Sequence, residues 1–109
     1  VRRVKSHLGL KKVRVSFGRR GDPVISTVAL CAGAGGAVLG GVEADVYLTG
    51  EMRHHDVLAA RNRGITVILA GHTNTERGYL PRLRDRLAEA MPGCAFTVST
   101  RDCTPWVEA

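Results

Sequence analysis

The chain has few aromatic residues, no long apolar run and no closely spaced cysteine pair. Aromatic residues make up 5% of its 109 residues, too few for the stacking surface that single-stranded nucleic acid binds. No stretch approaches the roughly 20 apolar residues of a membrane-spanning helix, so we expect no membrane partner. The cysteines, Cys31, Cys94 and Cys103, form no C-x-x-C motif. We therefore expect reduced thiols in a cytoplasmic protein that could also be nuclear, and a buried Cys31.

Basic residues outnumber acidic ones by 16 to 10, which gives a formal net charge of +6. Such a charge invites a nucleic-acid partner. However, the basic residues are scattered along the chain, and no aromatic residues alternate with them. A solvated basic surface is preferred over nucleic-acid binding, and packing of a basic segment against an acidic partner is a further alternative.

The length and the 44% hydrophobic content fit one α/β domain over residues 1–109. The glycine- and proline-containing segment 18–23 predicts a turn, and the apolar run 24–31 predicts a strand that is buried on both faces. Hydrophobic periodicity predicts helices at 1–8, 38–41 and 52–62, an amphipathic helix along Leu80, Leu83, Leu87 and Met91, and strands at 10–17, 24–31, 45–49, 65–70 and 95–99, before a tail at 104–106.

Segment 45–70 reads as strand, helix and strand with short connections. This order predicts a right-handed crossover between parallel strands, and therefore an α/β fold with a partly parallel sheet and flanking helices. In such sheets, ligands bind beyond the carboxyl ends of the strands. Because the loops 32–36, 49–53 and 71–76 all follow strand ends, we expect them to converge.

The last of these loops contains a histidine and a glutamate four residues apart, His72 and Glu76. On a helical turn these side chains share one face, where they could bind one divalent metal ion. The local pattern also fits a capping box, in which Glu76 folds back onto the backbone of Thr73 and His72 is an ordinary loop histidine. On the local pattern alone the capping box is preferred, although the two interpretations are not exclusive. The expected convergence of the loops favours the metal.

The other two loops have less specific patterns. Gly33 and Gly35 begin a dinucleotide-type motif that lacks its third glycine, so a tight turn with close backbone approach is preferred over an anion site. Thr49, Gly50 and Glu51 precede the adjacent histidines 54 and 55, which cannot both face one site. For His55, a packing role is preferred over metal ligation.

Taken in order, segments 44–56 and 71–78 resemble the NIF-three-like family (NGG-one interacting factor three-like, also known as GTP cyclohydrolase 1 type 2 homologues). YLTGEM at 47–52 and NTERG at 74–78 are similar to its animal branch. The resemblance covers about residues 24–90 and implies an α/β fold, a two-metal centre and a ring-shaped homo-oligomer, often a hexamer. The resemblance implies that His72 and Glu76 are metal ligands. We expect six further residues to line the same cavity: Thr49, Gly50, Glu51, His55, Gly33 and Gly35.

In this family the other ligands, an adjacent histidine pair and an aspartate, lie in an N-terminal half that this chain lacks. We therefore expect the chain, which starts at Val1, to be a C-terminal fragment whose partner is that N-terminal half. Two side chains leave a divalent ion short of its usual four to six ligands. We expect weak or no binding of Zn²⁺, Mn²⁺, iron or Mg²⁺ by this fragment, and no activity.

If the complete protein is an enzyme, metal-activated water attacking a phosphate or ring-carbon substrate is the expected hydrolase chemistry. The sequence identifies neither the catalytic residues nor the substrate. The alternative from the resemblance is a non-catalytic scaffold that binds transcriptional regulators.

Overall fold

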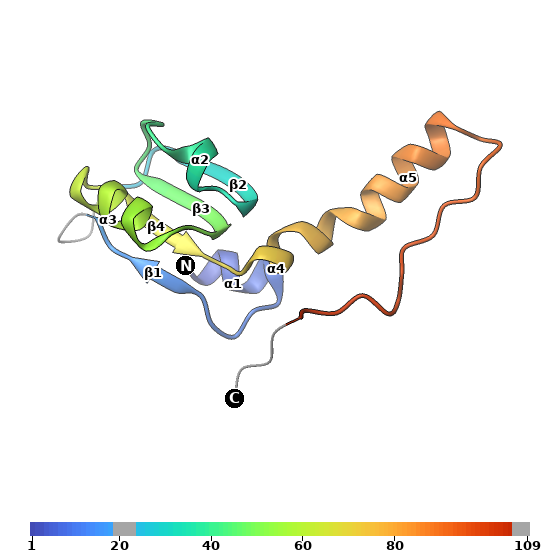
Figure 1. Cartoon of the computed structure of the whole chain (residues 1–109), viewed down its shortest axis with the longest axis horizontal. Coiled ribbons are helices and arrows are strands. Elements are labelled where there is room, and N and C mark those ends of the chain that lie inside the picture. Colours follow the sequence, from blue (N-terminus) through green and yellow to red (C-terminus); the bar gives the residue numbers. More distant parts are fainter. Residues whose placement is uncertain (19–23, 106–109) are drawn as a thin grey trace.

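The computed structural model describes residues 1–18 and 24–105. Most of the turn predicted at 18–23, and Trp106 of the predicted tail, lie outside these residues. The described residues form one four-stranded sheet in the order β1-β4-β3-β2, and Figure 1 shows its arrangement. The strands are β1 (Arg14–Ser16), β2 (Val28–Ala34), β3 (Val46–Glu51) and β4 (Thr66–Leu69), and the helices are α1 (Arg2–Leu8), α2 (Gly36–Leu39), α3 (His54–Asn62), α4 (His72–Glu76), the 3₁₀ turn η1 (Arg77–Tyr79) and α5 (Leu80–Ala90).

The central strands run parallel, as predicted. β3 pairs in parallel with both β2 and β4, while β1 pairs with β4 in the antiparallel direction. Helix α2 lies between β2 and β3 in the chain, and α3 lies between β3 and β4. The predicted α/β class with a partly parallel sheet is therefore confirmed. The carboxyl ends of β2, β3 and β4 meet at one edge of the sheet.

One face of the sheet forms the core together with α2 and α3. Leu39 and Ala60 from these helices pack with Tyr47, Val67 and Leu69 from the strands. Aromatic and β-branched residues fit a pleated surface well, and burying each such side chain contributes about 1.5–3 kcal/mol. This core fixes the positions from which the three strand ends leave the sheet.

The prediction of a doubly buried strand at 24–31 is wrong. Strand β2 begins only at Val28, and the residues Val28 and Leu30 are 53% and 71% exposed. Asp45 accepts hydrogen bonds from the backbone N–H groups of Ser26 and Thr27, both at 2.9 Å, so a side chain takes the place of a neighbouring strand there. β2 is also an edge strand, with core packing on one face only. Cys31 is accordingly only partly buried.

Helix α5 forms as predicted, but among residues 1–18 and 24–105 no sheet or helix layer covers it. It projects away from the sheet in Figure 1, and its apolar residues Leu80 and Leu83, with Met91 directly after it, remain substantially exposed. The radius of gyration is 16.3 Å, above the value of about 13 Å for a compact 100-residue domain. In the described part of the chain, no strand pairs with the predicted strand 95–99, so the alternating pattern there stays irregular.

The helices are short compared with a membrane-spanning helix. Among the described residues, the longest helix is α5 with 11 residues, and no helix there has the length and apolar character to cross a membrane.

Candidate metal centre

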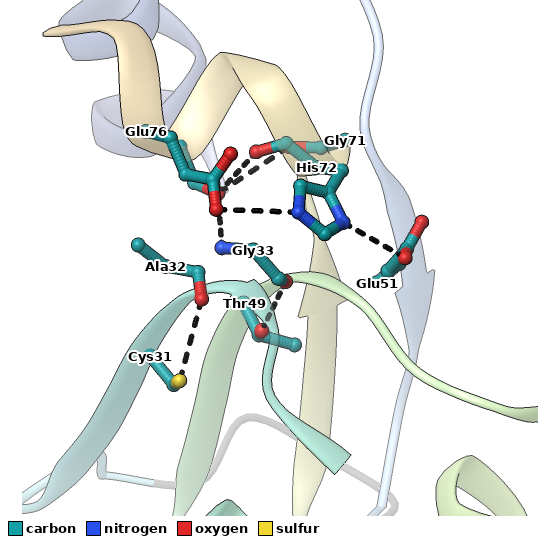
Figure 2. A network of polar contacts seen from close by, with 9 residues as sticks. Cys31, Ala32, Gly33, Thr49, Glu51, Gly71, His72 and Glu76 are labelled. Atoms are coloured by element: carbon teal, nitrogen blue, oxygen red, sulfur yellow. Dashed lines mark hydrogen bonds and ion pairs between the residues drawn. The ribbon is translucent and has the colours of Figure 1, made fainter.

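The site lies at the sheet edge where the three parallel strands end. Glu51 is the last residue of β3, and His72 is the first residue of α4, which follows β4. Figure 2 shows the imidazole of His72 between two carboxylates. Nδ1 of His72 lies 2.8 Å from Oε1 of Glu51, and Nε2 lies 3.2 Å from Oε1 of Glu76. The two carboxylates therefore contact opposite edges of the same ring.

The helix that carries His72 and Glu76 begins earlier than a capping box would require. Gly71, with φ of 92°, occupies the N-cap, so Thr73 lies inside the helix. Within the described residues no side chain caps this helix, and Glu76 contacts the ring of His72 instead of the backbone of Thr73. The capping-box interpretation is therefore wrong, because a glycine already provides the backbone turn into the helix.

The backbone of Gly33 passes directly beside the His72–Glu76 pair. A Cβ atom at Gly33 would lie 2.5 Å from Oε1 of Glu76 and 3.0 Å from Nε2 of His72, and its φ is +67°. The N–H group of Gly33 donates a hydrogen bond to the Thr75 hydroxyl at 2.9 Å. Its carbonyl accepts one from the hydroxyl of Thr49, which is fully buried, at 3.0 Å. Gly33 is thus fixed between β3 and α4.

Two further glycines permit equally close contacts. A Cβ atom at Gly50 would lie 2.8 Å from Cα of His72, and one at Gly35 would lie 2.3 Å from Oγ1 of Thr49. The N–H group of Gly71 donates to the carbonyl of Gly50 at 2.8 Å. The loops 32–36, 49–53 and 71–76 therefore converge as expected, with close backbone approach as the role of their glycines.

The pair of carboxylates and the imidazole remain accessible to solvent. The side chains of His72, Glu51 and Glu76 are 43%, 50% and 47% exposed. The hydrogen bond to Glu51 is the main cause that raises the pKa of His72 above its ordinary value of 6.5; partial loss of hydration lowers this pKa, and the charges of Glu76 and Glu51 raise it further.

A cavity of about 1130 Å³ adjoins the site. Its lining includes Glu51 and His72, together with Lys12 and Arg14 from the β1 segment. Sequence reasoning missed these two basic residues and Thr75. Both residues belong to the predicted strand 10–17, but only the pairing of β1 with β4 brings that segment to the cavity.

Among the described residues, the hydrogen bonds and ion pairs of His72 and Glu76 do not involve His55. It is exposed near the start of α3, and its ring contacts that of His54 in an edge-to-face arrangement with centroids 6.1 Å apart. In the described ranges, the cavity beside His72 is lined by Gly50 and Glu51 among the expected residues, but not by Thr49, Gly33, Gly35 or His55. A cavity-lining role for these four residues stays a prediction for the longer protein.

The separation of Nε2 of His72 and Oε1 of Glu76 fits two ligands of one metal ion. Metal–nitrogen and metal–oxygen bonds of about 2.0–2.2 Å place adjacent ligand atoms about 2.9–3.4 Å apart, for octahedral to tetrahedral angles. The observed 3.2 Å lies within this range. Residues 1–18 and 24–105 hold no group of three or more His, Cys, Asp or Glu residues arranged for a metal, because Glu51 contacts the far edge of the ring.

The fold and the site together define an α/β protein with a histidine–carboxylate site at the carboxyl ends of parallel strands. The family model described as Duf34/NIF3 (NGG1p interacting factor 3) matches residues 1–105, so the chain belongs to this family. The resemblance inferred from the two sequence motifs is thereby confirmed.

Known members are similar over most of this chain. The chain is 56% identical to human NIF3-like protein 1 over 87 residues and 55% identical to the mouse protein over 89 residues, which supports the animal-type resemblance. These alignments cover 78% and 80% of this chain but 23% and 24% of the relatives, so the chain spans about a quarter of their length. The crystal structure of a Staphylococcus aureus hypothetical protein matches 97% of this chain and 37% of its own, with a TM-score of 0.72 and 28% identity.

Proposed function

We propose that this chain supplies part of a dinuclear metal centre in a longer NIF3-family protein, with His72 and Glu76 as ligands. The observation that carries this proposal is the 3.2 Å separation between Nε2 of His72 and Oε1 of Glu76. Their exposure and their place at the carboxyl ends of the strands support it, because a metal needs an accessible position for further ligands.

The same geometry predicts an incomplete site in this chain alone. Two ligand atoms are fewer than the four to six that a divalent ion takes. The chain covers about a quarter of the length of its relatives, which leaves a large part of the family fold to provide the remaining ligands. We infer that the N-terminal half of the same protein completes the centre, and that this chain by itself binds metal weakly or not at all.

The proposed reaction class is metal-dependent hydrolysis of an anionic substrate. A divalent ion in such a centre would polarise the substrate and lower the pKa of a bound water molecule. The side chains of Lys12 and Arg14 line the cavity next to His72, where their positive charge would favour a phosphate ester over a neutral substrate. In this proposal His72 and Glu76 hold the ion, and Lys12 and Arg14 attract the substrate.

The open apolar surfaces support a larger assembly. Leu30 and Leu48 line a second cavity of about 320 Å³ beside α1, and the apolar residues of α5 are also uncovered. Unpartnered apolar surface of this kind is typical of an interface. We propose that the N-terminal half of the same protein covers the β2 face and that α5 contributes to a homo-oligomer.

A non-catalytic scaffold is the second candidate, since a yeast relative carries the name NGG1-interacting factor 3. The test is a screen of the longer protein, loaded with Zn²⁺ or Mn²⁺, against phosphate esters. His72→Ala serves as the inactive variant, and His54→Ala, at an exposed position on α3, serves as the matched control. Turnover that is lost only in His72→Ala supports the hydrolase. Partner binding that survives His72→Ala, in a protein without turnover, supports the scaffold.

A further inference from the structure

We propose that Glu51 is a positioning residue, which holds the imidazole proton of His72 on Nδ1 and so leaves Nε2 free as a ligand atom. This inference deepens the proposed function and rests on it for the identity of the ligand. It assigns a role to the Thr49-Gly50-Glu51 segment, for which the sequence indicated only a place in the cavity.

The two carboxylates compete for one proton. A neutral imidazole has a single N–H group, and the hydrogen bond made by one ring nitrogen decides which nitrogen is the free acceptor. Oε1 of Glu51 lies 2.8 Å from Nδ1, whereas Oε1 of Glu76 lies 3.2 Å from Nε2. The shorter contact favours the proton on Nδ1. The lone pair of Nε2 then faces the side of Glu76, where a cation would be bound by both atoms.

The backbone holds Glu51 in place for this contact. Glu51 is paired with Ala34 of β2, and its carbonyl accepts a hydrogen bond from the N–H group of Gly35 at 3.2 Å. Gly50 allows the chain to approach His72 closely, since a Cβ atom there would lie 2.8 Å from Cα of His72. Thr49 fixes the carbonyl of Gly33 on the other side. The three residues therefore form one support for the imidazole.

A direct ligand role for Glu51 does not fit the same geometry. Glu51 contacts Nδ1, and Glu76 contacts Nε2 on the opposite edge of the ring. Across the described ranges, no three acidic, histidine or cysteine residues are arranged around one point. Carboxylates that accept a hydrogen bond from a metal-binding histidine orient its ring and increase its basicity, and their loss typically weakens metal binding by about 10–100-fold.

The test measures the tautomer of His72 by ¹⁵N NMR of the imidazole in the longer, metal-free protein. The measurement is made at about pH 9, where a histidine is neutral. His72→Ala identifies the signal. We expect the proton on Nδ1 in the parent protein, and a shift of the proton toward Nε2 in Glu51→Ala. Glu51→Asp keeps the charge but withdraws the carboxylate by one methylene group, and we expect the same shift. Glu89→Ala, on α5, is the control that leaves the tautomer unchanged.

Zn²⁺ affinity is then measured by calorimetry on the same variants. We expect Glu51→Ala to weaken it by about 10–100-fold and Glu89→Ala to leave it unchanged. A proton found on Nε2 in the parent protein, or an unchanged tautomer in both Glu51 variants, would overturn the inference. So would unchanged Zn²⁺ affinity in Glu51→Ala where His72→Ala abolishes binding. If His72→Ala leaves the affinity unchanged, the proposed ligand role fails, and the tautomer result still decides the role of Glu51.

Discussion

The backbone of Gly33 lies so close to the carboxylate of Glu76 that a Cβ atom at position 33 would come within 2.5 Å of Oε1. Gly33 and Glu76 are 43 positions apart in the chain, and the backbone of Gly33 limits the positions that the Glu76 carboxylate can occupy. Because φ at Gly33 is +67°, a side chain would also impose backbone strain. The glycine loop is therefore part of the site, although it supplies no side chain to it.

Replacing Gly33 by alanine should destabilise the fold and displace Glu76. The left-handed backbone alone costs a residue other than glycine about 1–2 kcal/mol, and the contact with Oε1 adds to this. The measurement is the free energy of unfolding in urea. The control is Gly78→Ala, where a Cβ atom has nothing within 4 Å and φ is not positive. Equal effects of the two substitutions would show that the Gly33 contact is unimportant.

The hydroxyl group of Thr49 should stabilise the loop that carries Gly33. Thr49→Val keeps the shape of the side chain but removes the hydrogen bond to the buried carbonyl of Gly33. Leaving such an acceptor unsatisfied costs about 1–3 kcal/mol in the free energy of unfolding, measured in urea. The matched substitution Thr97→Val, at an exposed position, should change the stability little. An effect of Thr49→Val no larger than that of Thr97→Val would argue against the prediction.

The pKa of His72 should lie above 6.5 in the metal-free protein, because Glu51 and Glu76 favour the protonated ring. Because the pKa is raised in the folded state, the contact of the protonated ring with the carboxylates contributes to the free energy of unfolding. This contribution is complete at pH values below the pKa of histidine in the unfolded chain, about 6.5. The contribution is lost as the pH rises through the folded-state value. An NMR titration of His72 measures the shift, and Glu51→Ala should lower the pKa. A pKa of His72 that is the same in both proteins would contradict the assigned cause.

Metal binding should show the opposite pH dependence, since the ligand form of histidine is the neutral ring. The affinity of the longer protein for Zn²⁺ should therefore rise as the pH increases through the pKa of His72. Calorimetry at several pH values measures this rise. Affinity that is constant across this range would indicate that His72 does not lose a proton on binding.

The basic residues of the β1 segment should attract an anionic substrate. Replacing Lys12 and Arg14 together by alanine should weaken inhibition of the longer protein by inorganic phosphate roughly fivefold at low ionic strength, and less at high salt. The control is Arg82→Ala, an exposed position on α5. Unchanged inhibition at low salt would remove these residues from the substrate site.

Local sequence patterns were sufficient for the parts of the fold that depend on near neighbours. The strand–helix–strand unit at 45–70 and the order of the loops at the sheet edge could be predicted from periodicity and glycine positions. The burial of β2 could not be predicted, because a run of apolar residues does not indicate whether a strand lies at the centre or at the edge of a sheet. The strand expected at 95–99 failed for a related reason, since a strand requires a partner that no local pattern specifies.

The candidate site shows the same division. The spacing of His72 and Glu76 placed them on one helical face, and the structure brings them within 3.2 Å. The contact of Glu51 with the other ring edge depends on strand register across 21 residues, which the sequence does not display. The sequence also does not show that His55, which is close to Glu51 in sequence, belongs to helix α3 and contacts the ring of His54.

The metal content of the longer protein, compared with that of this 109-residue chain and of the His72→Ala variant, tests the central claim most directly. Measured side by side after exposure to Zn²⁺ or Mn²⁺, the longer protein should retain metal. Its His72→Ala variant should lose the ion that His72 and Glu76 hold, and the 109-residue chain should retain little or none. Tight binding by this chain alone, or full metal content in His72→Ala, would contradict the account.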